Sequence, residues 1–183
     1  DHYKLISHAK KRKIKFLSSA FDLESLKFLS NLNLDFIKIP SGEIDNIPYL
    51  QQVGRLNKKT ILSTGMSTIR EIQKAVSILK TSGLSHKKLT ILQCNTEYPS
   101  PLKDANINVL INLKKKFKTS VGYSDHTIGG ESIFAAVSLG ASIIEKHFTL
   151  DQNDNGPDHS ASASVEELKN IIKISKKILL TLG

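Results

Sequence analysis

Two histidines end two apolar runs of the chain at equivalent positions. His126 follows Ser124 by two residues in the run SVGYSDHT, and His147 follows Glu145 by two residues in the run SIIEKHFT. On an extended strand, residues two apart project to the same side, and adjacent strands lie about 4.8 Å apart. Two imidazoles at matching heights are therefore able to share one divalent metal ion, with positions left for substrate and water. Two ligands do not specify a metal, so hydrogen bonding of both histidines to loops stays the alternative.

A lysine interrupts a third apolar run, DFIKIPSGE, where Lys38 lies between two isoleucines. An ammonium group that faces the interior of a fold needs a partner, because an unpaired buried charge is costly. A bound anionic substrate is one such partner, and Glu43 is another. Two alternatives stay open, namely an ion pair without further role and a Schiff base with a carbonyl substrate.

Serines recur at the ends of four apolar runs, at positions 19, 41, 63 and 124. Small hydroxyl groups beside the backbone N–H groups of the PSGE and STG segments are able to hold a phosphate. Gly42 and Gly65 let the backbone approach an anion closely. One serine in a loop is weak evidence, but the repetition at equivalent positions indicates an anion-binding site.

The runs that carry these residues are short, β-branched and aliphatic, which is typical of buried parallel strands. Six such runs occur, at 15–22, 35–43, 60–65, 90–98, 120–127 and 142–149. Helical patterns fill the gaps, and their expected starts lie near Asp22, Pro48, Thr68, Ile107, Glu131 and Ser164. Both Thr68 with Glu71 and Ser164 with Glu167 match a capping box. Strands and helices thus alternate, which indicates a parallel sheet with right-handed crossovers.

Six units do not close an eight-stranded barrel, which takes about 250 residues, and this chain has 183. It opens on DHYKLISHAKKRK, which is typical of a helix already under way. We therefore predict an α/β fold, a partial (β/α)8 TIM barrel with six of its eight units, in one domain over residues 1–183. The C-terminal ends of barrel strands line the active site, where the polar residues fall. A doubly wound sheet is the alternative, but no glycine-rich turn follows the first run.

Composition narrows the class of protein. Hydrophobic residues make up 39% and charged residues 23%, as in ordinary globular domains. No apolar stretch has the length of a membrane span, and no signal peptide is visible. The single cysteine, Cys94, excludes an internal disulfide framework and fits a reducing cytoplasm. We therefore expect a cytoplasmic protein without a membrane partner.

The net charge of +9 suggests a nucleic-acid partner, but the position of the lysines argues against one. They fall on the expected outer helix faces and turns, without interleaved aromatic residues and with few arginines. We therefore expect no nucleic-acid partner. A positive field still favours a small anionic substrate.

Six motifs occur in order along the chain: KIPSGE, ILSTGMST, LQCNTEYPSP, VGYSDHTIGG, IIEKHFTLD and GPDHSAS. Together they resemble the N-acetylneuraminate synthase family, which includes the sialic, legionaminic and pseudaminic acid synthases. The resemblance implies a transferase of carbohydrate biosynthesis that condenses phosphoenolpyruvate with an N-acetylated hexosamine, such as N-acetylmannosamine. The products would be a nine-carbon 2-keto sugar acid and phosphate. It also implies that the N-terminal barrel units and a small C-terminal antifreeze-like domain are absent here, and that the full-length protein is a homodimer.

The resemblance also implies roles for individual residues. His126 and His147 match the metal ligands, and imidazole ligands favour Mn²⁺ over Mg²⁺. Glu43 matches a glutamate suited to acid–base work, Lys38 an electrostatic clamp on the anion, and Asp158 an acid near metal and sugar. The matched substrate contacts are Ser19, Lys38, Ser41, Ser63, Asn95, Thr96, Tyr98, Ser124 and Asp158. The motif GPDHSAS departs from the family pattern, because Ser160 replaces a lysine.

Three alternatives to this function stay open. A barrel that condenses phosphoenolpyruvate with sugar phosphates should carry arginines for the second phosphate, but Arg12, Arg55 and Arg70 do not lie at strand ends. A Schiff-base aldolase would use Lys38 or Lys146. The third alternative is an inactive fragment or a binding module.

Overall fold

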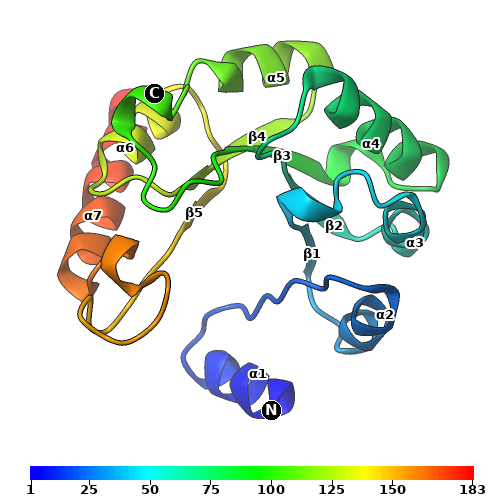
Figure 1. Ribbon diagram of the computed structural model, residues 1–183, viewed down its shortest axis with the longest axis horizontal. Coiled ribbons are helices and arrows are strands. Elements are labelled where there is room, and N and C mark those ends of the chain that lie inside the picture. Colours follow the sequence, from blue (N-terminus) through cyan, green and yellow to red (C-terminus); the bar gives the residue numbers. More distant parts are fainter. The chain divides into compact units, whose positions relative to one another are not determined.

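The computed structural model describes residues 1–183, which divide into two compact units. The first unit contains residues 1–62 and 69–89, and the second contains residues 63–68 and 90–183. In both units, helices connect parallel strands (Figure 1). The strand order follows the chain, β1-β2-β3-β4-β5, without the reversal that a doubly wound sheet requires. This topology confirms the α/β class and the partial barrel that the sequence predicts.

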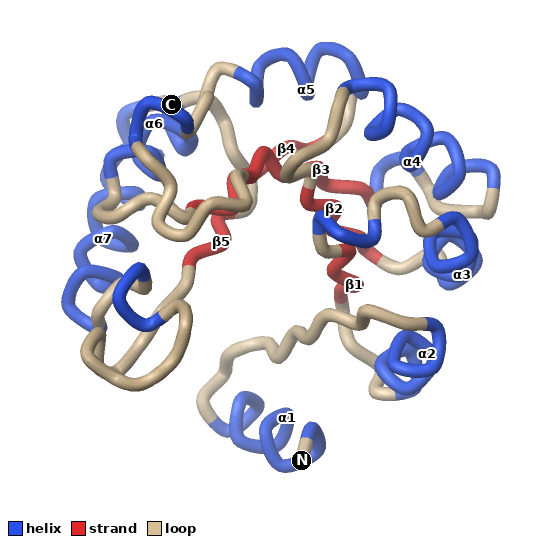
Figure 2. The backbone as a smooth tube through the Cα atoms, in the orientation of Figure 1, coloured by secondary structure: helices blue, strands red, loops and turns tan.

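The first unit is built around two buried strands. Its elements are α1 (His2–Lys11), α2 (Leu23–Asn31), β1 (Phe36–Ile39), α3 (Ile47–Leu56), β2 (Lys59–Ser63) and α4 (Ile69–Thr81). β1 pairs with β2 in parallel, with Lys38 opposite Ile61 and Ile39 opposite Leu62. Helix α3 packs against α2 and α4 (Figure 2). The last residue of β2, Ser63, belongs to the second unit.

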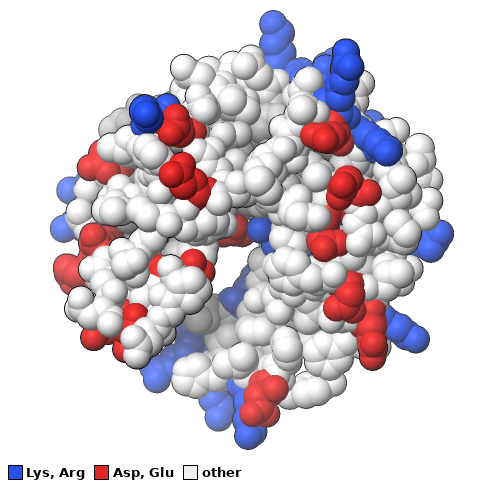
Figure 3. All heavy atoms as spheres, in the orientation of Figure 1, with Lys and Arg blue, Asp and Glu red and all other residues white.

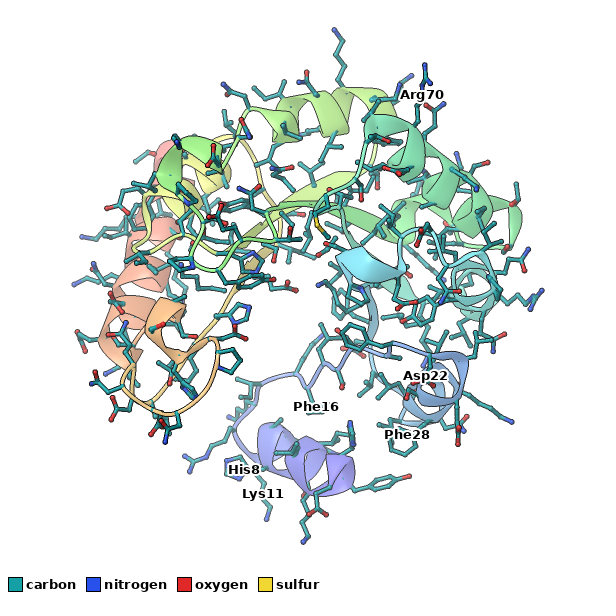
Figure 4. All side chains as sticks on the ribbon, in the orientation of Figure 1. His8, Lys11, Phe16, Asp22, Phe28 and Arg70 are labelled. Carbon is teal, nitrogen blue, oxygen red and sulfur yellow. The ribbon has the colours of Figure 1, made fainter.

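Short polar side chains start the helices of this unit. The carboxylate of Asp22 accepts a hydrogen bond from the backbone N–H of Ser25 at 2.6 Å (Figure 4). Asn46 caps α3 in the same way, through Tyr49 N–H at 3.2 Å, and Pro48 lies in the first turn, where no N–H is needed. A cap of this kind stabilises the start of a helix, because it satisfies a backbone N–H that has no partner within the helix.

The second unit holds three parallel strands. Its elements are β3 (Leu89–Cys94), α5 (Val109–Phe117), β4 (Ser120–Asp125), α6 (Glu131–Ser138), β5 (Ile144–Lys146) and α7 (Val165–Thr181). The first residue of β3 belongs to the first unit. β4 pairs with both neighbours, and Ser124 lies opposite Cys94 on one side and Glu145 on the other. Helices α6 and α7 pack together, and the predicted capping box of Ser164 and Glu167 starts α7.

Gly122 lies in β4 at a place without room for a side chain. A Cβ atom there would lie 2.4 Å from the carbonyl oxygen of Ile143 and 2.5 Å from Cδ2 of Leu92. The Ile143 carbonyl also accepts a hydrogen bond from Tyr123 N–H at 2.9 Å. Glycine therefore lets the chain that leads into β5 lie directly against β4.

The predicted strand at 15–22 is wrong, because this segment forms one isolated β-bridge, between Ser19 and Lys38. One of its apolar side chains, Phe16, packs on a helix. The Phe16 ring contacts His2 of α1, whose ring also contacts Phe28 of α2 (Figure 4). The chain thus has five strands, not six, because this run pairs with β1 at a single residue only.

Most basic side chains lie on the surface, as the sequence predicts. Most Lys and Arg side chains in Figure 3 project outward from the surface. Arg70 is exposed in the first turn of α4, and Lys114, Lys115 and Lys116 are exposed on α5. No helix combines the length and the apolar character that crossing a membrane requires.

Candidate active site

The second unit brings the two predicted histidines together. Asp125 and Lys146 end β4 and β5 as register partners, and His126 and His147 follow them directly. The centroids of the two imidazole rings lie 5.2 Å apart, with an angle of 68° between the ring planes. The rings are therefore neighbours at matching heights, as their spacing predicts.

His126 is buried, and one of its ring nitrogens is already occupied. Nδ1 lies 2.6 Å from the carbonyl oxygen of Asn95, so it carries the proton and leaves Nε2 with a free lone pair. Burial lowers the pKa of His126, because the charged ring loses its water, and His147 lowers it further, although the Asn95 carbonyl opposes the shift. The ring is thus kept neutral, which is the form that binds a metal ion.

His147 has a comparable partner in Asp158. Nδ1 of His147 lies 3.6 Å from Oδ2 of Asp158. A metal-ligating histidine almost always directs its other ring nitrogen at a carboxylate or carbonyl oxygen, which fixes its orientation. His126 meets this condition through a hydrogen bond with Asn95, whereas His147 has Asp158 near its Nδ1 but beyond hydrogen-bond distance. No group of three His, Cys, Asp or Glu side chains is placed to hold a metal ion, so the chain offers at most two imidazoles.

Tyr98 covers both imidazoles. Its ring centroid lies 4.0 Å from that of His126 and 5.3 Å from that of His147. Partial burial raises the pKa of Tyr98, and the negative charges of Cys94, Asp158 and Glu145 add to the rise. The phenol therefore keeps its proton at neutral pH and is available as a hydrogen-bond donor.

Three further predicted residues lie in this unit. The hydroxyl of Ser124 donates to Oε1 of Glu145 at 2.7 Å. The side-chain amide of Asn95 donates to the Asp104 carbonyl at 2.6 Å, so Asn95 supports His126 through its backbone and is itself held through its side chain. Thr96 is half-buried beside it.

Ser63 has the clearest sign of a missing partner. Its hydroxyl is buried at the end of β2 and has no hydrogen-bond partner. Buried hydroxyl groups are nearly always paired in proteins, so an unpaired one indicates a bound group. Ser160, in contrast, is exposed in the short helix η4 (His159–Ala161).

The remaining predicted residues lie in the first unit. Lys38 is buried on β1, and Ser19 forms its β-bridge with it. Ser41 and Glu43 begin and end the 3-10 helix η1 (Ser41–Glu43), which follows β1. Oε2 of Glu43 accepts a hydrogen bond from Nδ2 of Asn46 at 2.6 Å, so the cap of α3 also orients this carboxylate.

One feature of the second unit was not predicted from the sequence. Lys146 and Asp125 form a buried ion pair, with Nζ 2.7 Å from Oδ2 and side chains 5% and 0% exposed. The sequence did contain a signal for this pair, because each histidine directly follows a charged residue, and the two charges have opposite signs. Because the ammonium group is enclosed by this pair, Lys146 is a poor candidate for a Schiff base.

Comparison with known proteins extends the sequence argument. The NeuB family model matches residues 1–183. The chain is 50% identical to N,N'-diacetyllegionaminic acid synthase of Campylobacter jejuni over 182 residues, which cover 100% of this chain and 54% of that protein. Other relatives, 33–41% identical, are named as legionaminic acid, pseudaminic acid and N-acetylneuraminate-9-phosphate synthases. The chain spans about half the length of the curated relatives it matches.

Solved structures agree. The spore coat polysaccharide biosynthesis protein SpsE of Bacillus subtilis superposes with a TM-score of 0.94 at 34% identity, over 98% of this chain and 50% of that one. The sialic acid synthetase of Leptospira borgpetersenii, solved with citrate, gives 0.93 at 35% identity, over 98% of this chain and 62% of that one. Since a family model covers the whole chain and its fold matches these structures closely, the chain belongs to the NeuB family.

Proposed function

We propose that the protein is a sialic-acid-type synthase, which condenses phosphoenolpyruvate with an N-acetylated amino sugar to a nine-carbon 2-keto acid and phosphate. The observation that carries this proposal is the pair of imidazoles after β4 and β5, in a chain whose relatives are synthases of this type. We also propose that the protein is located in the cytoplasm and that its full-length form is a homodimer.

His126 and His147 are the proposed ligands of a divalent metal ion, Mn²⁺ rather than Mg²⁺, because imidazole ligands suit the softer ion. The Nδ1 of His126 is hydrogen-bonded to the Asn95 carbonyl, which leaves its Nε2 for the ion, and Asp158 lies near the Nδ1 of His147. With only two protein ligands, the other positions are left for substrate and water. When bound, the ion would polarise the carbonyl oxygen of the open-chain sugar.

Phosphoenolpyruvate, which is an anion, is the proposed ligand of the serine hydroxyl groups and of Lys38. Ser63 offers an unpaired buried hydroxyl, which a phosphate or carboxylate oxygen would satisfy. Ser124 is the other proposed contact in the second unit, and Ser19, Ser41 and Lys38 are the proposed contacts in the first. In each unit, the proposed role of these contacts is to hold the anion in a fixed position, which lowers the entropic part of the barrier.

The bond changes follow from the charges of the substrates. C3 of phosphoenolpyruvate attacks the sugar aldehyde carbon, so a C–C bond forms, C2 becomes cationic, and the aldehyde oxygen becomes an alkoxide that takes up a proton to give a hydroxyl group. Water then adds at C2, and phosphate leaves with cleavage of its C–O bond. Glu43, oriented by Asn46, is the proposed group that takes the proton of this water or stabilises the cation. Asp158, which lies near His147, is the proposed acid on the sugar side, and Asn95, Thr96 and Tyr98 are proposed contacts of phosphate and sugar.

The test uses the protein at its full natural length, stripped of metal with a chelator. Phosphate release from phosphoenolpyruvate is measured with a panel of N-acetylated hexosamines, including N-acetylmannosamine, after addition of Mn²⁺, Mg²⁺ or neither. The expected result is metal-dependent release that requires a sugar, with a nine-carbon keto acid found by mass spectrometry. Release that requires a phosphorylated sugar, or covalent trapping of the carbonyl substrate at Lys38 by borohydride, would instead support the rival enzymes.

A further inference from the structure

The buried ion pair of Asp125 and Lys146 directly precedes the two histidines, one member before His126 and the other before His147. The strand register places the two charged residues opposite each other. Successive residues of a strand face opposite sides, so this pair faces away from the side on which Ser124 bonds Glu145. The ends of β4 and β5 are therefore tied together by side chains on both faces.

Each member of the pair is hydrogen-bonded beyond the ion pair itself. Nζ of Lys146 donates to Oδ2 of Asp125 at 2.7 Å and to the carbonyl oxygen of Thr127. Oδ1 of Asp125 accepts from the N–H of Thr127 at 3.0 Å and from its hydroxyl at 2.8 Å. The same contacts thus hold the backbone on both sides of His126 and the side chain next to His147.

Stability alone does not account for such a pair. Replacing a buried ion pair with apolar residues of similar volume is often neutral or stabilising, because desolvation offsets the attraction. Other ion pairs of the chain, such as Lys15–Asp35 and Lys169–Glu166, join side chains more than half exposed, and such pairs contribute little. A role in fixing relative position is the better-attested use of a buried pair.

The position of β5 is weakly fixed by its backbone, because this strand has only three residues, Ile144–Lys146. Few backbone hydrogen bonds set the register of so short a strand, and a slip by one residue would turn His147 to the opposite face. We propose that the Asp125–Lys146 pair is a positioning device, which holds His126 and His147 at the separation that binds the metal ion. This inference rests on the metal site of the proposed function.

The test separates position from stability through the double variant Asp125→Asn/Lys146→Met, which removes both charges, keeps similar volume and keeps an acceptor for Thr127. The dissociation constant for Mn²⁺ is measured on the full-length protein from the electron paramagnetic resonance signal of free Mn²⁺, and folding is followed by circular dichroism. We expect near-normal thermal unfolding and Mn²⁺ affinity 10- to 100-fold weaker, the range typical when groups that orient metal ligands are lost. The control, Lys169→Met in the exposed pair of α7, should leave both unchanged.

Two further variants, Asp125→Asn and His126→Ala, distinguish a failure of this inference from a failure of the proposed metal site. Asp125→Asn retains the shape and the acceptor for Thr127 but presents an amide to Lys146, so it should fold and bind Mn²⁺ at least tenfold more weakly. Mn²⁺ affinity within twofold of wild type in either folded variant of the ion pair would overturn the inference while the proposed metal site stands. His126→Ala is measured in parallel. If it left Mn²⁺ binding unchanged, the metal site itself would be wrong, and the inference would fall with it.

Discussion

Replacing Gly122 with alanine tests the packing that brings β5 against β4. The new Cβ atom would lie 2.4 Å from the Ile143 carbonyl oxygen and 2.5 Å from Leu92 Cδ2. The leucine is able to rotate, but the carbonyl is backbone, so relief requires the chain that leads into β5 to move. Overpacking of a core costs about 1–3 kcal/mol, and a backbone clash places this substitution near the upper end.

The unfolded state partly offsets this cost. Alanine restricts the unfolded chain more than glycine does, which stabilises the folded state by about 0.4–1 kcal/mol. We therefore expect Gly122→Ala to lower the free energy of unfolding by about 2 kcal/mol, which corresponds to a fall in Tm of about 4–8 °C for a domain of this size. Urea unfolding followed by circular dichroism measures the change.

Gly42→Ala is the matched control, because nothing lies within 4 Å of a Cβ atom at that position. Its free energy of unfolding should stay equal to that of wild type or rise slightly. If Gly122→Ala were as stable as Gly42→Ala, the close approach of β4 and the segment before β5 would be wrong.

Three further predictions concern the site. His126→Ala and His147→Ala should each abolish metal-dependent phosphate release while the circular dichroism spectrum stays unchanged, and near-normal turnover in either would refute the ligand assignment. Lys38→Met should raise the KM for phosphoenolpyruvate about 10- to 150-fold, since a charge-assisted contact contributes about 1.5–3 kcal/mol; a raised KM for the sugar alone would assign Lys38 to that substrate. Because the pKa of His126 is lowered in the folded state, the unfolded state binds more protons on acidification, so metal-free protein should lose stability as pH falls below about 6.5. His126→Gln should flatten this decline in urea unfolding between pH 7 and 5, and an unchanged slope would contradict it.

Local signals made part of the structure predictable. The capping box at Ser164 and Glu167 depends on residues three apart, and both of its hydrogen bonds form. The pairing of the two imidazoles depends only on strand register and alternation, so two equally spaced histidines sufficed to predict it. Their function as metal ligands stays a prediction.

Contacts between distant residues were not predictable in the same way. Phe16 lies in a run that has the composition of a strand, but its ring packs on His2, and nothing in the run itself indicates that partner. The role of the Asn95 carbonyl in orienting His126 belongs to the backbone, which the residue type does not reveal. The Asp125–Lys146 pair has the same register as the two histidines, one residue earlier, but the pattern of apolar runs does not reveal that these two charged side chains are buried.

The position of Tyr98 makes intrinsic tyrosine fluorescence a probe of the site. Residues 1–183 contain no tryptophan and four tyrosines, so their near-ultraviolet emission comes from tyrosine alone. Tyr49 and Tyr123 are enclosed in the cores of their units, and Tyr3 lies on α1. Of the four tyrosine rings, only that of Tyr98 contacts both imidazoles. An occupant of this site therefore changes the surroundings of one fluorophore out of four, and tyrosine emission reports its arrival without a label.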